Sequence, residues 1–257
     1  MKEYKLTRIN QVTKSAEEGN PKSMFKLGMH YAYIAFDDFA VGDKDAAYLQ
    51  ALYWLSEAAS AKVWKAYYWL GCVISDIGRI TSGGPYHAMY IKEAIKKDPV
   101  YIDIVSKLKN KGLLDEDDNV DIYEVNKAFV YLYRAVFFSC CTLYDYDHIS
   151  TRCFKVAAEK GISEAEAEFG RICYYCWHNW CNLFQDKNLE EAKEILDVEG
   201  VTVASIQSYY SDAYYWLVKA LEHGEDRYVE LLPELIKSKN VLNFINTPAD
   251  IVQLDAE

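Results

Sequence analysis

Long apolar runs are missing from this chain of 257 residues. The most apolar stretch, residues 136–143, is far shorter than the roughly 20 residues that a transmembrane helix needs, and Arg134 and Asp145 flank it. Residues 1–20 are polar and charged, and they lack the apolar segment of a secretion signal. We therefore expect a cytoplasmic protein that has no membrane partner.

Basic residues are also fewer than acidic ones. Lysine and arginine number 28 against 39 for aspartate and glutamate, which gives a net charge of -11. Nucleic-acid binding needs clustered cations, whereas the lysines are scattered along most of the chain. One local group consists of Lys92, Lys96, Lys97, Lys107, Lys109 and Lys111. Solvated helix faces explain this group better than a phosphate site does, so we expect no nucleic-acid partner.

Familiar catalytic motifs are absent from the sequence. Gly83 and Gly84 are not followed by the lysine and hydroxyl residue of a phosphate-binding loop, so they indicate a turn. The five histidines fall in different segments, and none belongs to a recognisable pair of nucleophile and base. The sequence therefore predicts a non-catalytic protein without a cofactor, and an enzyme with an unrecognised site ranks third among the alternatives.

The cysteines do not form a convincing metal site. Seven cysteines are an odd number, and in a reducing compartment they behave as small buried apolar residues. Cys173, Cys176, His178 and Cys181 are spaced like zinc ligands at first sight. On a helix, however, Cys173 and Cys176 share one face while His178 and Cys181 point away from it, so the four cannot converge. We expect no zinc.

An acidic run at residues 115–121 also fails as a calcium site. An EF-hand loop that began at Asp115 would need glycine at its sixth position and glutamate at its twelfth. The chain has Val120 and Asn126 there. A solvated acidic linker explains the run, so we expect no bound metal of either kind.

A recurring stripe of alanine with a large ring is the strongest positive signal in the sequence. Residues spaced by three, four and seven share one side of an α-helix, so each copy predicts a helix that packs closely against a neighbour. The copies are Ala51, Trp54, Leu55, Ala58; Ala128, Tyr131, Leu132, Ala135; and Ala213, Trp216, Leu217, Ala220. Recurrence of the stripe indicates stacked helical repeats.

Two further phrases recur with the stripe. Glycine follows a large apolar residue at Gly28, Gly71 and Gly170, where a helix is expected, and it predicts a position at which only a hydrogen atom fits against a partner helix. Alanine-rich helix ends are followed by a turn with glycine at Gly161 and Gly224, where a left-handed conformation would cap the helix.

Together these phrases resemble the Sel1-like repeat, a relative of the tetratricopeptide repeat that pairs two antiparallel helices. The resemblance is best over residues 16–61 and 145–175, and residues 211–224 match only the second helix. It implies an all-α fold, a right-handed superhelical solenoid of antiparallel helix pairs with a helical insertion. It also implies a scaffold that binds other proteins.

The domain prediction is a single helical-repeat domain over residues 1–257, in which residues 81–120 are an insertion or a degenerate repeat. The segment 121–141 is expected to be helical and fits either the first or the second helix of a repeat. A loop is expected at residues 198–205. Other helices are expected at residues 21–35, 43–60, 63–77, 86–97, 99–111, 146–160, 163–180, 188–196, 208–222 and 225–237, with a short one after Thr247.

The resemblance also places a set of side chains on the inner face of the superhelix. Tyrosine, tryptophan, methionine and arginine are the residue types that dominate protein interfaces, and the set includes four tyrosines, one methionine and one arginine. The set is Lys22, Phe25, Met29, Tyr33, Lys65, Tyr68, Cys72, Asp76, Glu164, Arg171, Tyr174 and Tyr175. Aromatic rings also fill gaps between helices, so roughly half of these side chains are expected to be buried instead.

The function that these observations favour is protein binding. Proteins that resemble this family include small cytosolic inhibitors and immunity proteins, and the net charge of -11 suits a basic toxin or effector as partner. The alternative is an adaptor that brings signalling or assembly partners together. Acidity and small size favour the inhibitor.

Overall fold

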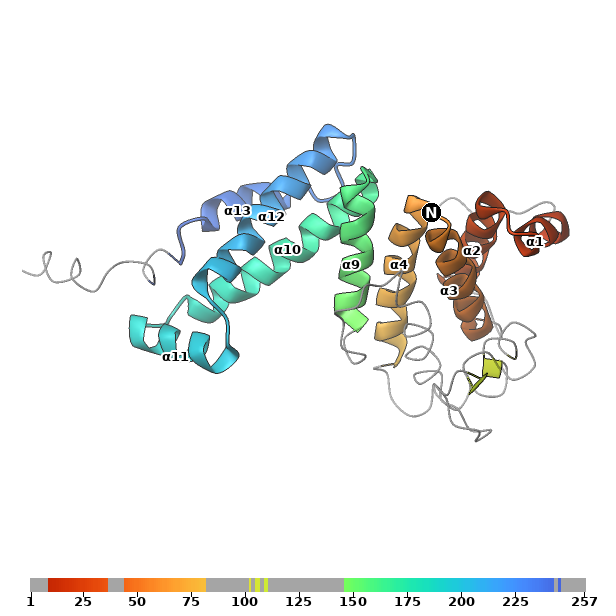
Figure 1. The fold of residues 1–257 in the computed structure, drawn as a ribbon. Helices are drawn as coiled ribbons and strands as arrows, with labels where there is room; N and C mark the ends of the chain where they lie inside the picture. Colours follow the sequence, from red (N-terminus) through yellow and green to blue (C-terminus); the bar gives the residue numbers. More distant parts are fainter. Residues whose placement is uncertain are drawn as a thin grey trace, which may run out of the picture. The chain divides into compact units, whose positions relative to one another are not determined.

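Helices make up the regular structure of the described part of the chain (Figure 1). The computed structural model describes residues 9–36, 44–81, 102, 105–106, 109–110, 146–242 and 245, with only the backbone described at 44–46, 49, 76–81 and 146–149. These residues contain no strand, so the all-α prediction is confirmed for them. Their helices are α1 (Ile9–Glu17), α2 (Pro21–Phe36), α3 (Lys44–Ser60), α4 (Trp64–Thr81), α9 (Tyr146–Glu159), α10 (Ser163–Phe184), α11 (Leu189–Glu199), α12 (Val203–Glu222) and α13 (Leu231–Ser238).

Contacts divide the chain into an N-terminal unit, residues 1–160, and a C-terminal unit, residues 161–257. Within the N-terminal unit, α2 packs on α1 and α3, and α4 packs on α3 and α9. Within the C-terminal unit, α10 packs against α12, and α13 contacts both of them. The expectation of one continuous domain over residues 1–257 stays a prediction.

The three glycines singled out in the sequence lie at three helix contacts. A Cβ atom added at Gly28 of α2 would lie 2.7 Å from Leu55 Cγ of α3. At Gly170 of α10 it would lie 2.9 Å from Leu217 Cγ of α12. Leu55 and Leu217 occupy the same place in two copies of the alanine stripe. The prediction that only hydrogen fits at these glycines is confirmed.

The third contact joins α4 to α9. A Cβ atom at Gly71 would lie 2.7 Å from Cε1 of Phe154. Phe154, Ala157 and Ala158 repeat the spacing of Leu55, Ala58 and Ala59, and all six are buried. The helix that meets Gly71 is therefore the one predicted at 146–160. The stripe at Ala128 and the helix predicted at 121–141 lie outside the described residues.

Left-handed residues end several helices, as the turn phrase predicted. Gly161 and Gly224 have φ of 77° and 83°. Lys62 occupies the equivalent place between α3 and α4 with φ of 64°, and the N–H of Val63 donates to the carbonyl of Ala58 at 3.0 Å. Because a side chain crowds the backbone in this conformation, Lys62 carries a local cost that glycine avoids.

We expect Lys62→Gly to raise the free energy of unfolding by about 0.5 to 1 kcal/mol, since relief of the left-handed strain exceeds the added backbone freedom of glycine. The measurement is urea unfolding followed by circular dichroism. Ala61→Gly, one residue earlier and also exposed, is the control. It should lower the free energy of unfolding, because Ala61 is not one of the residues with positive φ. Stabilisation by both substitutions, or by neither, would contradict this account.

Several predicted boundaries need correction. The loop expected at residues 198–205 is wrong in part, because α11 continues to Glu199 and α12 begins at Val203. The side chain of Thr202 accepts from the Ser205 N–H, and Ser205 Oγ accepts from the Thr202 N–H, so the pair caps α12. The helix expected from residue 225 begins at Leu231. Helix α1 was not predicted at all.

Most of the predicted insertion lies outside the described residues, as do the helix predicted at 86–97 and the C-terminal one after Thr247. Of the helix predicted at 99–111, residues 102, 105–106 and 109–110 are described, and they are helical. No helix in the described ranges is both long and apolar enough to span a bilayer.

Candidate protein-binding site

The first two copies of the predicted inner face lie in the N-terminal unit. Lys22 is exposed, and Tyr68 is buried, with its ring 5.9 Å from that of Phe154. Tyr33 is half-buried and meets the Trp69 ring edge-on at 5.2 Å. The remaining described members, all half-buried, are Phe25, Met29, Lys65 and Cys72. The side chain of Asp76 lies outside the described residues.

The third copy lies on α10 and divides between core and surface. Tyr174 is buried, and its hydroxyl donates to Oε2 of Glu234 on α13 at 2.6 Å. Burial and this carboxylate raise the pKa of Tyr174 to about 12, so the phenol stays a donor at neutral pH. Tyr174 therefore holds α13 against α10. Tyr175 is 46% exposed, and Arg171 and Glu164 are half-buried.

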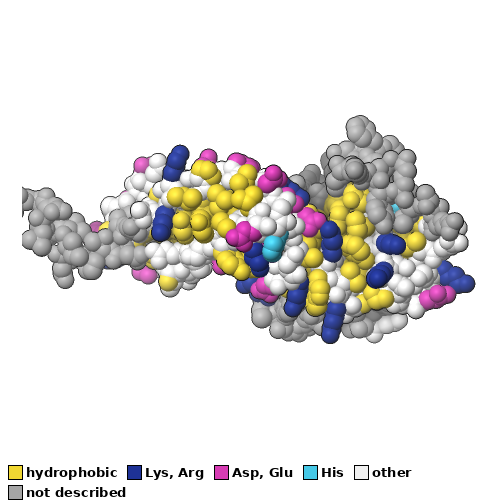
Figure 2. Space-filling model, turned by 90° about the horizontal axis from the view of Figure 1, so that it is seen from above, with side chains coloured by type: hydrophobic (Ala, Val, Ile, Leu, Met, Phe, Trp, Pro, Cys, Tyr) yellow, Lys and Arg dark blue, Asp and Glu magenta, His cyan; other side chains and the backbone are white. Residues whose placement is uncertain are grey.

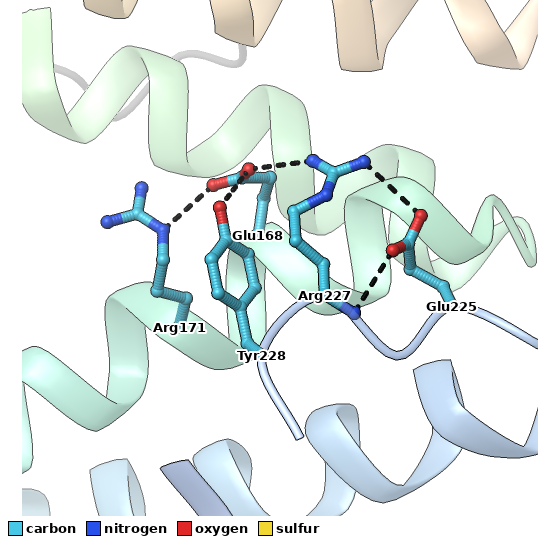
Figure 3. Close-up of polar contacts among 5 residues, drawn as sticks. All are labelled: Glu168, Arg171, Glu225, Arg227 and Tyr228. Atoms are coloured by element: carbon cyan, nitrogen blue, oxygen red, sulfur yellow. Dashed lines mark hydrogen bonds and ion pairs between the residues drawn. The ribbon is translucent and has the colours of Figure 1, made fainter. Parts of the chain in front are cut away.

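A polar cluster surrounds Glu168, one turn before Arg171 on α10 (Figure 3). Oε2 of Glu168 accepts from Arg171 Nε at 2.9 Å. Oε1 accepts from Nη1 of Arg227 at 3.1 Å and from the Tyr228 hydroxyl at 2.7 Å. The turn between α12 and α13 supplies Arg227 and Tyr228, so the cluster ties this turn to α10. We call Glu168, Arg171, Tyr175, Arg227 and Tyr228 the Arg171 cluster.

Aromatic rings flank the arginine at the centre of the cluster. The guanidinium carbon of Arg171 lies 5.7 Å from the centroid of Tyr175 and 5.5 Å from that of Tyr228. Cations within about 6 Å of a ring centroid are attracted to its face. Burial raises the pKa of Tyr228, and its hydrogen bond to Glu168 acts in the same direction. Tyr228 therefore remains protonated and keeps donating to Glu168 at neutral pH.

The Arg171 cluster consists mainly of charged and aromatic side chains from α10 and the turn after α12. Glu168 is only 13% exposed and accepts hydrogen bonds from three side chains, so the cluster fixes the conformations of Arg171, Arg227 and Tyr228. Arginine and tyrosine are the residue types that anchor protein interfaces, especially when their conformations are fixed beforehand. Figure 2 shows apolar side chains among charged ones on one face of the C-terminal unit.

A buried carboxylate lies two residues before Glu168 on α10. Glu166 is fully buried, and its Oε2 lies 2.7 Å from Nδ1 of His223. Its Oε1 lies 3.6 Å from Nζ of Lys219, whose ammonium also lies 4.8 Å from the Trp216 ring. Glu166 stands in the first turn of α10, where the helix dipole favours negative charge. The arrangement joins the start of α10 to the end of α12.

Neither acidic residue was singled out by the sequence analysis. Glu166 precedes Phe169 by three positions and Gly170 by four, so helical spacing places it on the packed face of α10. That signal could have identified it. Glu168 carried no such signal, because two of its partners, Arg227 and Tyr228, are 59 and 60 residues away in the sequence.

The cysteines of α10 lie along an unbroken helix. Cys173 and Cys181 are buried and Cys176 is half-buried, while His178 stacks on the Tyr174 ring at 5.6 Å. Burial raises the pKa of the Cys176 thiol, and that of Cys181 to about 11, which disfavours the thiolate that binds metals. Within the described part of the chain, no group of three histidine, cysteine or acidic side chains is placed to hold a metal.

Comparison with protein-family models, curated proteins and solved structures finds no match to this chain. The resemblance to the Sel1-like repeat therefore rests on the chain's own residues.

Proposed function

We propose that this chain is a non-catalytic helical-repeat protein, a Sel1-like solenoid, that binds another protein. The observation that carries the proposal is the repeated contact of Gly28, Gly71 and Gly170 with a large side chain of the next packed helix. Three helix pairs with one contact design are what repeat arrays consist of. Such arrays serve mainly as extended surfaces for other proteins.

The partner that we propose is a basic toxin or effector, which the chain inhibits by covering it. The net charge of -11 creates a negative field that speeds encounter with a basic protein. The Arg171 cluster supplies the aromatic and arginine side chains that a contact surface needs. In this proposal Tyr175 is the ring that the partner covers, since it is 46% exposed within the cluster.

We expect Tyr175→Ala to weaken binding of the partner protein that co-purifies with the chain or is encoded beside its gene. A loss of about 2 kcal/mol, roughly 30-fold in Kd, is typical of an interface anchor. Surface plasmon resonance with the purified partner should show that the substitution accelerates dissociation, whereas added salt slows association.

Tyr214→Ala on α12 is the matched control, because Tyr214 is 44% exposed and lies outside the cluster. It should change Kd less than threefold, in keeping with the small effect of residues away from the anchors. Inhibition is tested by adding the chain to the partner's own activity assay. An unchanged Kd with Tyr175→Ala contradicts the assigned surface, and a bound partner that keeps its full activity contradicts the inhibitor role.

A further inference from the structure

We propose that Arg171 receives a carboxylate of the partner protein, the side chain of an aspartate or glutamate, end-on through its two terminal nitrogens. This inference rests on the proposed function, because it requires a protein partner. It adds the chemistry of the occupant and the atoms that hold it.

The guanidinium of Arg171 is bonded within the chain at one of its three nitrogens. Nε of Arg171 donates to Glu168 at 2.9 Å, and the centroids of the Tyr175 and Tyr228 rings lie 5.7 Å and 5.5 Å from the guanidinium carbon. Among the residues that the structure describes, none forms a hydrogen bond or ion pair with Nη1 or Nη2 of Arg171. Figure 3 shows these two nitrogens pointing away from Glu168. The Arg171 side chain as a whole is 28% exposed.

Arg227, the other arginine of the cluster, is bonded differently. Nη1 of Arg227 contacts Glu168 at 3.1 Å, and its Nη2 contacts Glu225 at 3.2 Å. Both ends of Arg227 are therefore occupied by carboxylates of the chain itself. Arg171 carries the same guanidinium group, and its Nε contacts one carboxylate, that of Glu168. Its two terminal nitrogens are therefore the position for a second carboxylate, that of the partner.

The terminal nitrogens of Arg171 suit a carboxylate better than a phosphate. The two oxygens of a carboxylate match the two terminal nitrogens of one guanidinium in a planar, bidentate pair. A phosphate carries more charge, and here it would meet Glu168, Glu225 and the field of a chain with net charge -11. A partner of positive net charge can still supply the acidic residue that Arg171 receives. Long-range attraction depends on the net charges of the two proteins, whereas the position in which they dock depends on single residues.

Preorganisation supports the same assignment. An arginine whose Nε is bonded and whose guanidinium carbon lies near two aromatic rings loses little freedom when a ligand arrives. The exposed ring of Tyr175, whose centroid lies 5.7 Å from the guanidinium carbon, can cover an apolar neighbour of the incoming acid. The fitting segment is therefore an acidic residue next to an aromatic or aliphatic one.

The test uses the intact wild-type chain labelled with ¹⁵N and ¹³C in arginine, observed by NMR. The probe is an acetylated, amidated pentapeptide with a central glutamate between two tyrosines. Its control has glutamine in place of glutamate. We expect the Nε and Cζ resonances of Arg171 to shift saturably with the glutamate peptide and at least tenfold more weakly with the glutamine peptide. Those of Arg152 in α9 should not shift.

Two further arms complete the test. Inorganic phosphate at matched ionic strength should give no saturable shift at Arg171, and a phosphate affinity above that of the glutamate peptide would overturn the proposal. Arg171→Lys keeps the charge and loses the planar fork, so its affinity for the glutamate peptide should fall about tenfold, measured by peptide fluorescence anisotropy. Equal binding of both peptides by the wild type, or of the glutamate peptide by both proteins, would also overturn it.

These outcomes are separable from failure of the proposed function. If the glutamate and glutamine peptides bind alike while Tyr175→Ala still weakens the complex with the partner protein, the carboxylate assignment alone is wrong. If no partner protein binds the wild-type chain, the proposed function is wrong.

Discussion

Trp177→Ala should lower the free energy of unfolding of the C-terminal unit by about 3 to 5 kcal/mol, the usual effect of removing a buried tryptophan. Trp177 of α10 is 1% exposed, and its ring meets Tyr210 of α12 edge-on at 5.3 Å. Its indole N–H donates to Ser238 Oγ of α13 at 2.7 Å. One side chain thus joins three helices, so its loss leaves a cavity between them.

Two variants separate packing from hydrogen bonding at this site. Trp177→Phe keeps a six-membered ring and removes the N–H donor with the rest of the indole, so it should cost less than the alanine variant. Ser238→Ala removes only the acceptor and should cost about 1 to 3 kcal/mol, because it leaves a buried N–H without a partner. Urea unfolding followed by circular dichroism measures all three. A midpoint for Trp177→Ala equal to that of the wild type would contradict the three-helix contact.

The residues that make the repeat contacts could be predicted from the sequence because each lies in a short pattern of neighbouring residues. Gly28 and Gly170 each follow a large apolar residue, and their partners Leu55 and Leu217 stand at one fixed place in the alanine stripe. Helical periodicity alone converts such spacing into a packed face. Periodicity does not indicate which helices pack against each other. Gly71 meets Phe154, 83 residues later by subtraction of the two positions, and no periodic signal gives that separation.

The candidate site was only partly predictable for a related reason. Arg171 and Tyr175 share one face of α10 because they are four residues apart, so the repeat resemblance could place them together. Tyr174 was assigned to the same face, but it is buried under Glu234 of α13. Arg227 and Tyr228 lie in a turn where the sequence predicted a helix. Their contact with Glu168 depends on where α12 ends, which local propensity determines poorly.

The sharpest test of the repeat design is Gly71→Leu. A Cβ atom at this position would lie 2.7 to 2.9 Å from three carbons of the Phe154 ring, so the substitution forces α4 and α9 apart. Overpacking of this kind costs about 1 to 3 kcal/mol of the free energy of unfolding. Because leucine has a higher helix propensity than glycine by roughly 1 kcal/mol, a net loss of stability would identify the contact as its cause.

A compensating substitution makes that cause testable. Phe154→Ala alone should cost about 3 to 5 kcal/mol through the cavity it leaves. In the double variant the new leucine occupies the space of the missing ring, so the two effects should fall short of their sum by about 2 kcal/mol. Urea unfolding of the wild type, both single variants and the double variant gives this coupling energy. Additivity within about 0.5 kcal/mol would show that Gly71 and Phe154 do not touch. The pair α4–α9 would then differ from the other two helix pairs. In those pairs Gly28 and Gly170 contact Leu55 and Leu217, and the coupling would have to be measured there.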